Sequence, residues 1–373
     1  MPKNIVICCD GTNNQFGTRN TNVVRLFQCL DRSPEAEQVA FYDAGIGTLA
    51  LPGWRTKVMK KLSSWWDLAF AAALMRNVED AIRFLMVHYE PGDQIYMFGF
   101  SRGAYTVRVV AGLLYKCGLP PRGNDSIWPY FVQQYKRRGR DQLHRDFQET
   151  FGVPCPVRFL GVWDTVSTVG YVWDPQTFDY TFFNDGVTFV RHAMAVDERR
   201  GFFRTNRWRR DDNLGENGIP KWKQYFFPGV HSDVGGGYTD GALWKAPLQW
   251  IAAEAEECGL KFAPGRLVKI LAAEPAKLWH TTLQHESLSI GWRLAGFVPK
   301  QKQREKPDGD WETYYRLAWP KRRQIFSGEM LHRTVIERWR DIPEYRPPNL
   351  DEEIMAALVG RLTPDDVALP YEK

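Results

Sequence analysis

Residues 94–103, QIYMFGFSRG, join an apolar run to the pentapeptide Gly99-Phe100-Ser101-Arg102-Gly103. The run predicts a buried strand, and apolar residues recur every three or four positions over 104–114, which predicts a helix. A nucleophilic serine of the GxSxG type needs this context of strand, sharp turn and helix. Its two glycines avoid collisions with the neighbouring strand or helix. We therefore predict Ser101 as a nucleophile; the alternative is an ordinary serine cap on a glycine-rich turn.

Five apolar runs of this kind occur along the chain. They are continuous rather than alternating, which is typical of strands buried on both faces of a parallel sheet. The runs are Asn4–Asp10, Gln38–Asp43, Gln94–Phe100, Val157–Asp164 and Gln224–Val230. Helical patterns, such as Met75–Tyr89, lie between them. The alternation predicts an α/β fold of the α/β-hydrolase type, with a mostly parallel central sheet and helices on both faces.

A serine hydroxyl needs a base, and His231 is the strongest candidate among the seven histidines. It follows the run Gln224–Val230 and opens the glycine-rich segment 231–237, HSDVGGG, at the carboxyl end of a predicted strand. Active sites of α/β proteins form at that end. The role of His332 stays open, and we expect surface or capping roles for the remaining histidines: His88, His144, His192, His280 and His285.

The third member of a triad is a carboxylate that orients the histidine. Asp164 ends the run Val157–Asp164 and lies between Ser101 and His231, which is the chain order expected of α/β-hydrolases. A helix cap is the alternative role for Asp164. Asp233, two residues after His231, is its rival for the orienting role, and its closeness in sequence favours a capping role in the glycine loop instead.

The loop after the first run, Asp10-Gly11-Thr12-Asn13-Asn14, contains a glycine. Such a loop supplies one oxyanion-hole amide in these enzymes, and the residue after the nucleophile supplies the other. We assign these roles to the backbone of Gly11 or Thr12 and to that of Arg102. Asp10 is predicted either to order the loop by hydrogen bonds or to act as a second, accessory carboxylate. Asp233 is the other candidate for an accessory carboxylate.

Composition excludes several protein classes. The 373 residues carry a net charge of only +5, which is far from the signature of a nucleic-acid-binding protein, and no nucleic-acid partner is expected. The six cysteines have neither disulfide nor zinc spacing, so we expect reduced thiols, no metal and no cofactor. There is no signal-peptide layout and no apolar stretch of the roughly 20 residues that span a bilayer. We expect a cytoplasmic protein, with signal-less export by a specialised secretion system as the alternative.

The chain divides into two predicted parts. Residues 1–300 form the catalytic domain, and 301–373 form a C-terminal extension packed on it. Within the first part, 49–75 combines tryptophans with lysines and is interpreted as a lid or interfacial insertion that allows peripheral membrane contact, or as a plain buried helix. Residues 300–312 are polar and predict an exposed loop, and the last twenty or so predict a surface helix and tail.

Five motifs occur together and in order over residues 4–290. They are CDGTNN (9–14), GFSRGAYT (99–106), GVWDTV (161–166), DERR (197–200) and FPGVHSDVGGGY (227–238). The chain thereby resembles an α/β-hydrolase-like domain family that includes type VI secretion phospholipase effectors. The resemblance implies a Ser-Asp-His triad, with Ser101, Asp164 and His231 as the matching residues, and esterase or phospholipase A activity on acyl esters. Those effectors carry large extra segments for membrane attachment and this chain is short, so a soluble ester remains an alternative substrate.

Parts of the sequence are also compatible with functions other than that of a serine hydrolase. Residues 5–12 faintly resemble the DxDGT strand of haloacid-dehalogenase phosphatases, but Cys8 stands where the attacking aspartate would be. Asp10, Asp164, His231 and Asp233 together are a candidate divalent-metal set. The basic clusters 136–140 and 199–210, with interleaved aromatic residues, are a candidate binding surface. A catalytically inactive hydrolase-fold scaffold is the main alternative.

Overall fold

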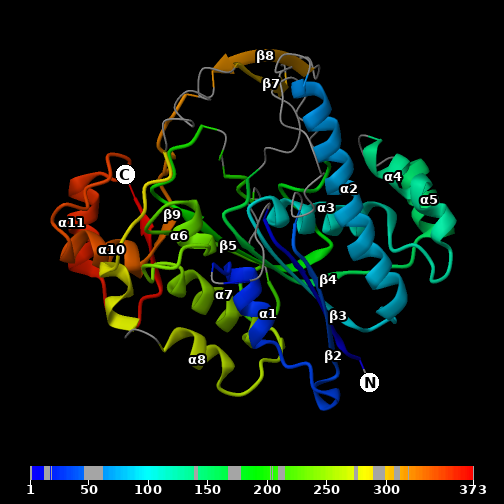
Figure 1. The fold of residues 1–373 in the computed structure, drawn as a ribbon, viewed down its shortest axis with the longest axis horizontal. Coiled ribbons are helices and arrows are strands. Elements are labelled where there is room, and N and C mark those ends of the chain that lie inside the picture. The colour runs from blue at the N-terminus through cyan, green and yellow to red at the C-terminus, as the bar shows by residue number, and fades with distance from the viewer. Residues whose placement is uncertain are drawn as a thin grey trace.

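An eight-stranded sheet forms the centre of the molecule (Figure 1), in the order β10-β9-β6-β5-β4-β3-β1-β2. All neighbouring strands are parallel except β10, which is antiparallel to β9. The strands are β1 (Asn4–Cys9), β2 (Gln38–Asp43), β3 (Gln94–Phe100), β4 (Val157–Trp163), β5 (Val187–Ala195), β6 (Trp222–Phe227), β9 (Glu329–His332) and β10 (Ala368–Tyr371). The predicted α/β architecture with a mostly parallel sheet is confirmed.

The computed structural model describes most of the chain. The described residues are 2–11, 17, 19–45, 62–137, 142–166, 178–201, 203, 205–208, 215–272, 276–288, 299–305, 311–317 and 319–372, with the backbone alone for 62–72, 276–277, 299–305 and 311–317. Thr12 and residues 49–61 of the predicted lid lie outside them. From Leu62 onward that segment belongs to one continuous helix, α2 (Leu62–His88), and its role as a lid stays a prediction.

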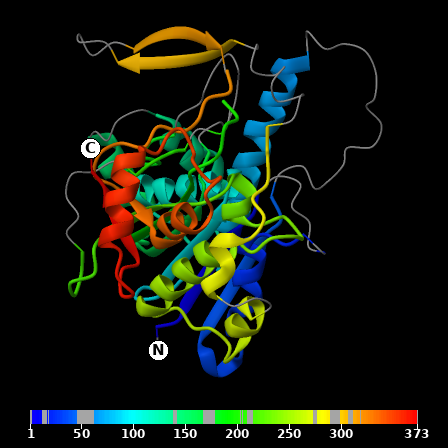
Figure 2. The ribbon, with the colours of Figure 1, turned by 90° about the vertical axis from the view of Figure 1, so that its left-hand side faces the viewer.

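Helices cover both faces of the sheet (Figures 1 and 2). Along β1, Ile5 and Ile7 pack on one face and Val6 and Cys8 on the other, which is why the strand is apolar throughout. The first face is covered by α2, α3 (Arg102–Cys117), α4 (Trp128–Lys136) and α5 (Gln142–Phe151). The second is covered by α1 (Asn22–Cys29), α7 (Lys245–Glu257) and α8 (Arg266–Leu271). None of the helices in the described ranges is both long and apolar enough to cross a membrane.

The C-terminal segment belongs to the same sheet. A third apolar cluster joins Met194 and Phe226 to Leu331 and to α10 (Arg333–Asp341) and α11 (Glu352–Arg361). The predicted terminal helix is therefore α11, but the tail after it is wrong, because residues 368–371 form strand β10. The division of the chain at residue 300 stays a prediction.

Two further predictions are corrected by the fold. The polar stretch 300–312 is not simply a loop: β7 (Pro299–Glu305) and β8 (Trp311–Leu317) pair as an antiparallel hairpin, which lies apart from the central sheet (Figure 2). Strands β5, β9 and β10 of the central sheet have no counterpart among the five predicted runs. The described residues also contain short helical elements: α6 (His231–Gly235) and the 3₁₀ helices Pro34–Ala36, Asp125–Ile127 and Ala276–Thr281.

Candidate active site

Ser101 lies on the turn between β3 and α3. Its backbone has φ 58° and ψ −119°, a strained conformation for a residue with a side chain. The turn is tight on both sides. A Cβ atom at Gly99 would lie 2.6 Å from the backbone of Ala104, and one at Gly103 would lie 2.1 Å from the Cys9 carbonyl. The two glycines of the pentapeptide are thus required by close approach of backbone, as the sequence predicts.

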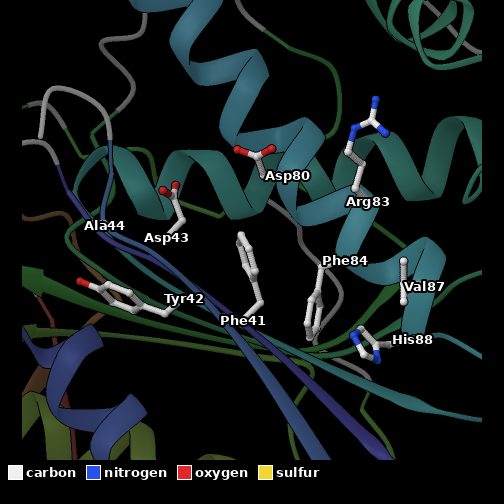
Figure 3. A pocket seen from close by; sticks show the side chains of 9 residues that line it. All are labelled: Phe41, Tyr42, Asp43, Ala44, Asp80, Arg83, Phe84, Val87 and His88. Atoms are coloured by element: carbon white, nitrogen blue, oxygen red, sulfur yellow. The ribbon is translucent and has the colours of Figure 1, made fainter. Parts of the chain in front are cut away.

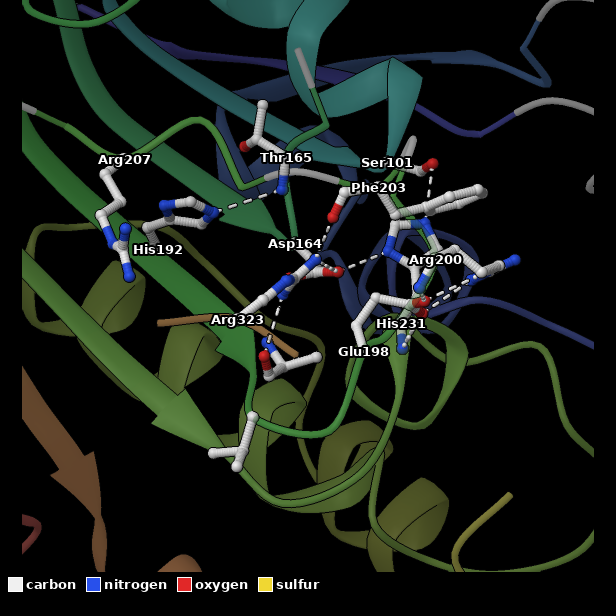
Figure 4. A network of polar contacts seen from close by, with 12 residues as sticks. Ser101, Asp164, Thr165, His192, Glu198, Arg200, Phe203, Arg207, His231 and Arg323 are labelled. Atoms are coloured by element: carbon white, nitrogen blue, oxygen red, sulfur yellow. Dashed lines mark hydrogen bonds and ion pairs between the residues drawn. The ribbon is translucent and has the colours of Figure 1, made fainter. Parts of the chain in front are cut away.

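His231 lies between Ser101 and Asp164 (Figure 4). Its Nε2 is 2.8 Å from Ser101 Oγ, and its Nδ1 is 2.5 Å from Asp164 Oδ2. The three residues come from the carboxyl ends of β3, β4 and β6, which meet at one edge of the parallel sheet. With Nδ1 protonated towards the carboxylate, Nε2 is the atom that can accept the serine proton.

Asp164 is fully buried and is held by four donors. Oδ1 accepts from the Ala195 amide at 3.0 Å and from Arg323 Nη1. Oδ2 accepts from His231 and, at 2.8 Å, from Arg323 Nη2. Burial alone would raise the pKa of Asp164, but the charge of Arg323 and the hydrogen bond to His231 hold that pKa well below its usual range. The carboxylate is therefore ionised at neutral pH.

Two aromatic rings pack against the imidazole of His231. Phe100 lies 4.6 Å and Phe203 4.8 Å from it between ring centroids. Burial lowers the pKa of His231, against the opposing pull of Asp164. The residue is therefore a neutral base at pH 7, as a catalytic histidine must be before it accepts a proton.

Glu198 fixes the backbone next to the histidine. Its carboxylate accepts from the His231 amide at 3.2 Å and binds Arg200 through both oxygens. Burial would raise the pKa of Glu198, but Arg200 lowers it to about 2. Arg200 lies over the Phe203 ring, 3.5 Å from its centroid. The DERR segment thus supports both the main chain and the ring wall of the site.

The loop after β1 is organised by Asp10. Its Oδ1 accepts from the Gly11 amide at 2.6 Å, and its Oδ2 accepts from Thr21 Oγ1 at 2.5 Å and Tyr42 at 3.0 Å. Asp10 therefore orders the loop, one of its two predicted roles. The same contact occupies the Gly11 amide, so Gly11 is a poorer oxyanion donor than predicted. That leaves Thr12, which lies outside the described residues, as the candidate beside Arg102, the first residue of α3.

Asp233 turns away from the Ser101–His231 contact. It accepts from the Val230 amide at 2.9 Å, which caps the single turn of α6, and from His285 Nδ1 at 2.6 Å. His285 also lies 3.1 Å from Asp240. Asp164, rather than Asp233, is thus the carboxylate that contacts His231, and the glycine-loop cap is the part that Asp233 plays.

Sequence reasoning missed Arg323, a neighbour of the Ser101–His231–Asp164 cluster, and misplaced three histidines. Arg323 gives no signal because it lies in the charged stretch 321–323, and nothing links that stretch to Asp164 until the chain folds. His144, His192 and His280 are buried, not surface residues. His192 accepts from the Thr165 amide at 3.2 Å and contacts the buried Arg108, so a long-range network, invisible in sequence, holds it inside β5.

The metal and binding-surface hypotheses find no support in the described part of the chain. Asp10 and Asp233 bind the partners given above. The described residues contain no cluster of three or more His, Cys, Asp or Glu suited to a metal. In the basic cluster 199–210, Arg199 pairs with Glu286, Arg207 with Glu329, and Trp208 is buried. Trp208 is therefore not available for stacking on a base, and the two arginines already have carboxylate partners; residues 138–140 of the other basic cluster lie outside the described residues.

An open groove of about 540 Å³ lies between edge strand β2 and helix α2 (Figure 3). Phe41, Phe84 and Val87 form an apolar wall, and Asp43 and Asp80 lie at one end. None of its lining residues belongs to the Ser101–His231–Asp164 cluster.

The chain is similar to several known proteins. Residues 3–254 match the model of the family described as "T6SS, Phospholipase effector Tle1-like, catalytic domain". An uncharacterized protein of Saccharomyces cerevisiae is 35% identical over 219 residues. That match spans 54% of this chain and 32% of the yeast protein, so this chain covers about a third of that relative's length.

Two solved structures are also similar. One is an uncharacterized protein from Pseudomonas aeruginosa, at 20% identity and a TM-score of 0.45, covering 74% of this chain and 49% of that one. The other is the Tle1 effector bound to the VgrG spike of the type 6 secretion system, at 13% identity and a TM-score of 0.46, covering 86% and 92%. Because the family model matches well over half of the chain, the protein belongs to the Tle1-like phospholipase effector catalytic-domain family of the type VI secretion system.

Proposed function

We propose that the protein is a serine hydrolase that cleaves acyl esters of phospholipids through an acyl-enzyme intermediate. Family membership supports phospholipase-type ester hydrolysis in general. The observation that carries the finer proposal is the continuous contact from Ser101 Oγ through His231 to the Asp164 carboxylate. A scaffold that had lost catalysis would have no need to keep a strained serine within 2.8 Å of a neutral imidazole.

The proposed reaction has two steps. Ser101 Oγ attacks the ester carbonyl carbon while its proton passes to His231 Nε2, and the tetrahedral oxyanion collapses as the glycerol oxygen leaves with that proton. Water then attacks the acyl-serine, giving its proton to His231, and the fatty acid leaves as Ser101 regains a proton. Asp164 stabilises the imidazolium in both steps. The Arg102 amide, with that of Thr12, is the proposed donor pair for the oxyanion.

The proposed substrate is a lipid in a membrane surface, reached by peripheral contact. The net charge of +5 favours an anionic surface, but modestly. Membership in an effector family supports delivery by a type VI secretion system as part of this proposal. A soluble ester is the substrate to be distinguished from it.

The test is labelling by a fluorophosphonate probe, followed by hydrolysis of p-nitrophenyl esters of increasing acyl length and of phospholipid vesicles. We expect labelling and turnover in the wild type and neither in Ser101→Ala. Ser126→Ala, at an exposed serine hydrogen-bonded to Asn124, is the matched control and is expected to behave as wild type.

The outcomes separate the alternatives. A preference for long acyl chains and vesicles supports a lipid substrate, whereas turnover of short soluble esters alone supports the soluble one. Activity that persists in a chelator removes the metal hypothesis. Absence of labelling and turnover in a folded wild type would leave the inactive scaffold.

A further inference from the structure

We propose that Arg323 is a positioning residue for the hydrolytic reaction: it fixes the Asp164 carboxylate and sets the pH at which His231 becomes a base. The inference rests on the hydrolase function proposed above. Arg323 lies well beyond residue 254, where the match to the catalytic-domain family ends. A segment outside that match thus reaches the centre of the site.

The guanidinium of Arg323 is held in one orientation. Nη1 donates to Asp164 and to the Ala195 carbonyl, and Nη2 donates to Asp164 at 2.8 Å and to the Phe203 carbonyl at 2.9 Å. Two donors on two carboxylate oxygens form the fork geometry that fixes a carboxylate plane. The two carbonyls fix the arginine in turn, so Asp164 is oriented before it meets His231.

The same arginine connects the Asp164 carboxylate with an aromatic ring beside the imidazole. Phe203, whose carbonyl binds Arg323, also places its ring against His231. Arg323 therefore supports both polar and aromatic sides of the imidazole. Its own carbonyl accepts from Asn349 at 3.1 Å, which anchors it to the C-terminal segment.

The charge of Arg323 also affects how readily His231 loses its proton. A buried carboxylate without a cation would hold the imidazole strongly in its protonated form, because the pair would then be neutral. With Arg323 present, the carboxylate is already compensated, and the imidazole loses its proton more readily. The other charged or titratable groups that act on the pair come from several elements: Glu198 and Arg200 after β5, and His192 on β5, which in turn contacts Arg108 on α3.

The experiment measures the rate of fluorophosphonate labelling of Ser101 against pH, which needs no knowledge of the natural substrate. The acid limb of this profile reports the ionisation of His231 in the free enzyme. In Arg323→Gln we expect the acid limb to shift to higher pH, by about 1 pH unit. We expect the plateau rate to fall on the order of 10²-fold, because the base is misplaced. In Arg323→Lys, which keeps the charge without the fork, we expect the limb to stay and the plateau to fall.

The matched control is Arg207→Gln. Arg207 pairs with Glu329 at 2.6 Å and binds the Gln324 carbonyl, so it anchors the segment next to Arg323 without being a partner of Asp164. It is expected to keep the wild-type limb and plateau. The same shift in Arg207→Gln would mean that segment anchoring, not the contact to Asp164, is responsible, and would overturn the inference.

The remaining outcomes are also decisive. An unmoved acid limb in folded Arg323→Gln, judged by circular dichroism, overturns the inference. If Arg323→Gln does not fold, Arg323→Lys carries the test, and wild-type labelling rates in it overturn the inference. A wild type that is not labelled at any pH contradicts the proposed function itself, which is a separate result.

Discussion

Asp164 meets two neighbours that depend on its charge in different ways. His231 needs the carboxylate to hold its tautomer, and Arg323 needs it because the guanidinium is buried. We expect Asp164→Asn to reduce kcat about 10⁴-fold through loss of the tautomer. It should also destabilise the fold by about 3–5 kcal/mol, because an uncompensated charge stays inside. Ester turnover and thermal melting measure the two effects separately.

The control for that substitution is Asp93→Asn. Asp93 is also buried and pairs with Lys3 at 2.6 Å, but it immediately precedes β3, at the end of the sheet opposite to Ser101. We expect Asp93→Asn to lower the melting temperature and leave turnover unchanged. Equal losses of turnover in the two variants would mean that the effect of Asp164→Asn is one of stability alone.

Asp197 illustrates the cost of burying an acid whose ion pair is long: Arg322 Nη1 lies 3.7 Å from Asp197 Oδ1. Burial raises the pKa of Asp197 to about 6, although Gly229 and Tyr345 donate to it. Between its ordinary pKa and about 6 the folded state binds more protons than the unfolded one, so stability falls as pH rises through that window. We expect Asp197→Asn to be more stable than wild type at pH 8, by about 1–3 kcal/mol, and equal to it below pH 4. Denaturant melts at the two pH values test this sign.

At the scale of elements, the contact between α3 and β1 depends on one missing side chain. A Cβ at Gly103 would lie 2.1 Å from the Cys9 carbonyl, and backbone on both sides leaves no room to yield. We expect Gly103→Ala to cost about 3 kcal/mol and to abolish labelling of Ser101, because α3 must move off the sheet. Gly360→Ala, in exposed α11 with no atom near its Cβ, should instead stabilise by about 0.5 kcal/mol. A Gly103→Ala variant with wild-type stability would contradict the close packing.

The elements that sequence predicted and those that it missed differ in the range of their interactions. Strands β1 to β4 and β6 are apolar on both faces, so local composition identifies them. Strand β5 carries Arg191 and His192, which are buried only because Glu254 and Arg108 reach them from α7 and α3. The contact of Ser101, His231 and Asp164 follows from motifs at strand ends. The contact of Arg323 with Asp164 cannot be predicted in this way, because no motif marks Arg323 and the two residues are 159 positions apart.

At the scale of the whole molecule, residues 319–372 are structurally part of the site. Arg323 binds Asp164, Tyr345 donates to Asp197 at 2.9 Å, and Asn349 donates to the Val196 carbonyl at 3.1 Å. Strand β9 also pairs with β6, the strand that leads to His231. The loop that carries Asp197 and Glu198 is therefore held from the C-terminal side, which the order of motifs along the chain does not suggest.

Two deletions test how far this dependence extends. Removing residues 319–373 exposes the edge of β6 and the apolar cluster around Phe226 and Leu331, and leaves Asp164 without its cation. We expect that variant to be insoluble or, if soluble, unlabelled at Ser101. The hairpin β7–β8 offers the matched control, because Pro299 pairs with Leu317 and a few Gly and Ser residues can replace 299–317 without stretching the chain. This hairpin deletion should have the melting temperature and the Ser101 labelling of the wild type. If it also fails to label, the hairpin contributes to the site. If the variant without residues 319–373 labels normally, the C-terminal segment does not contribute to the site.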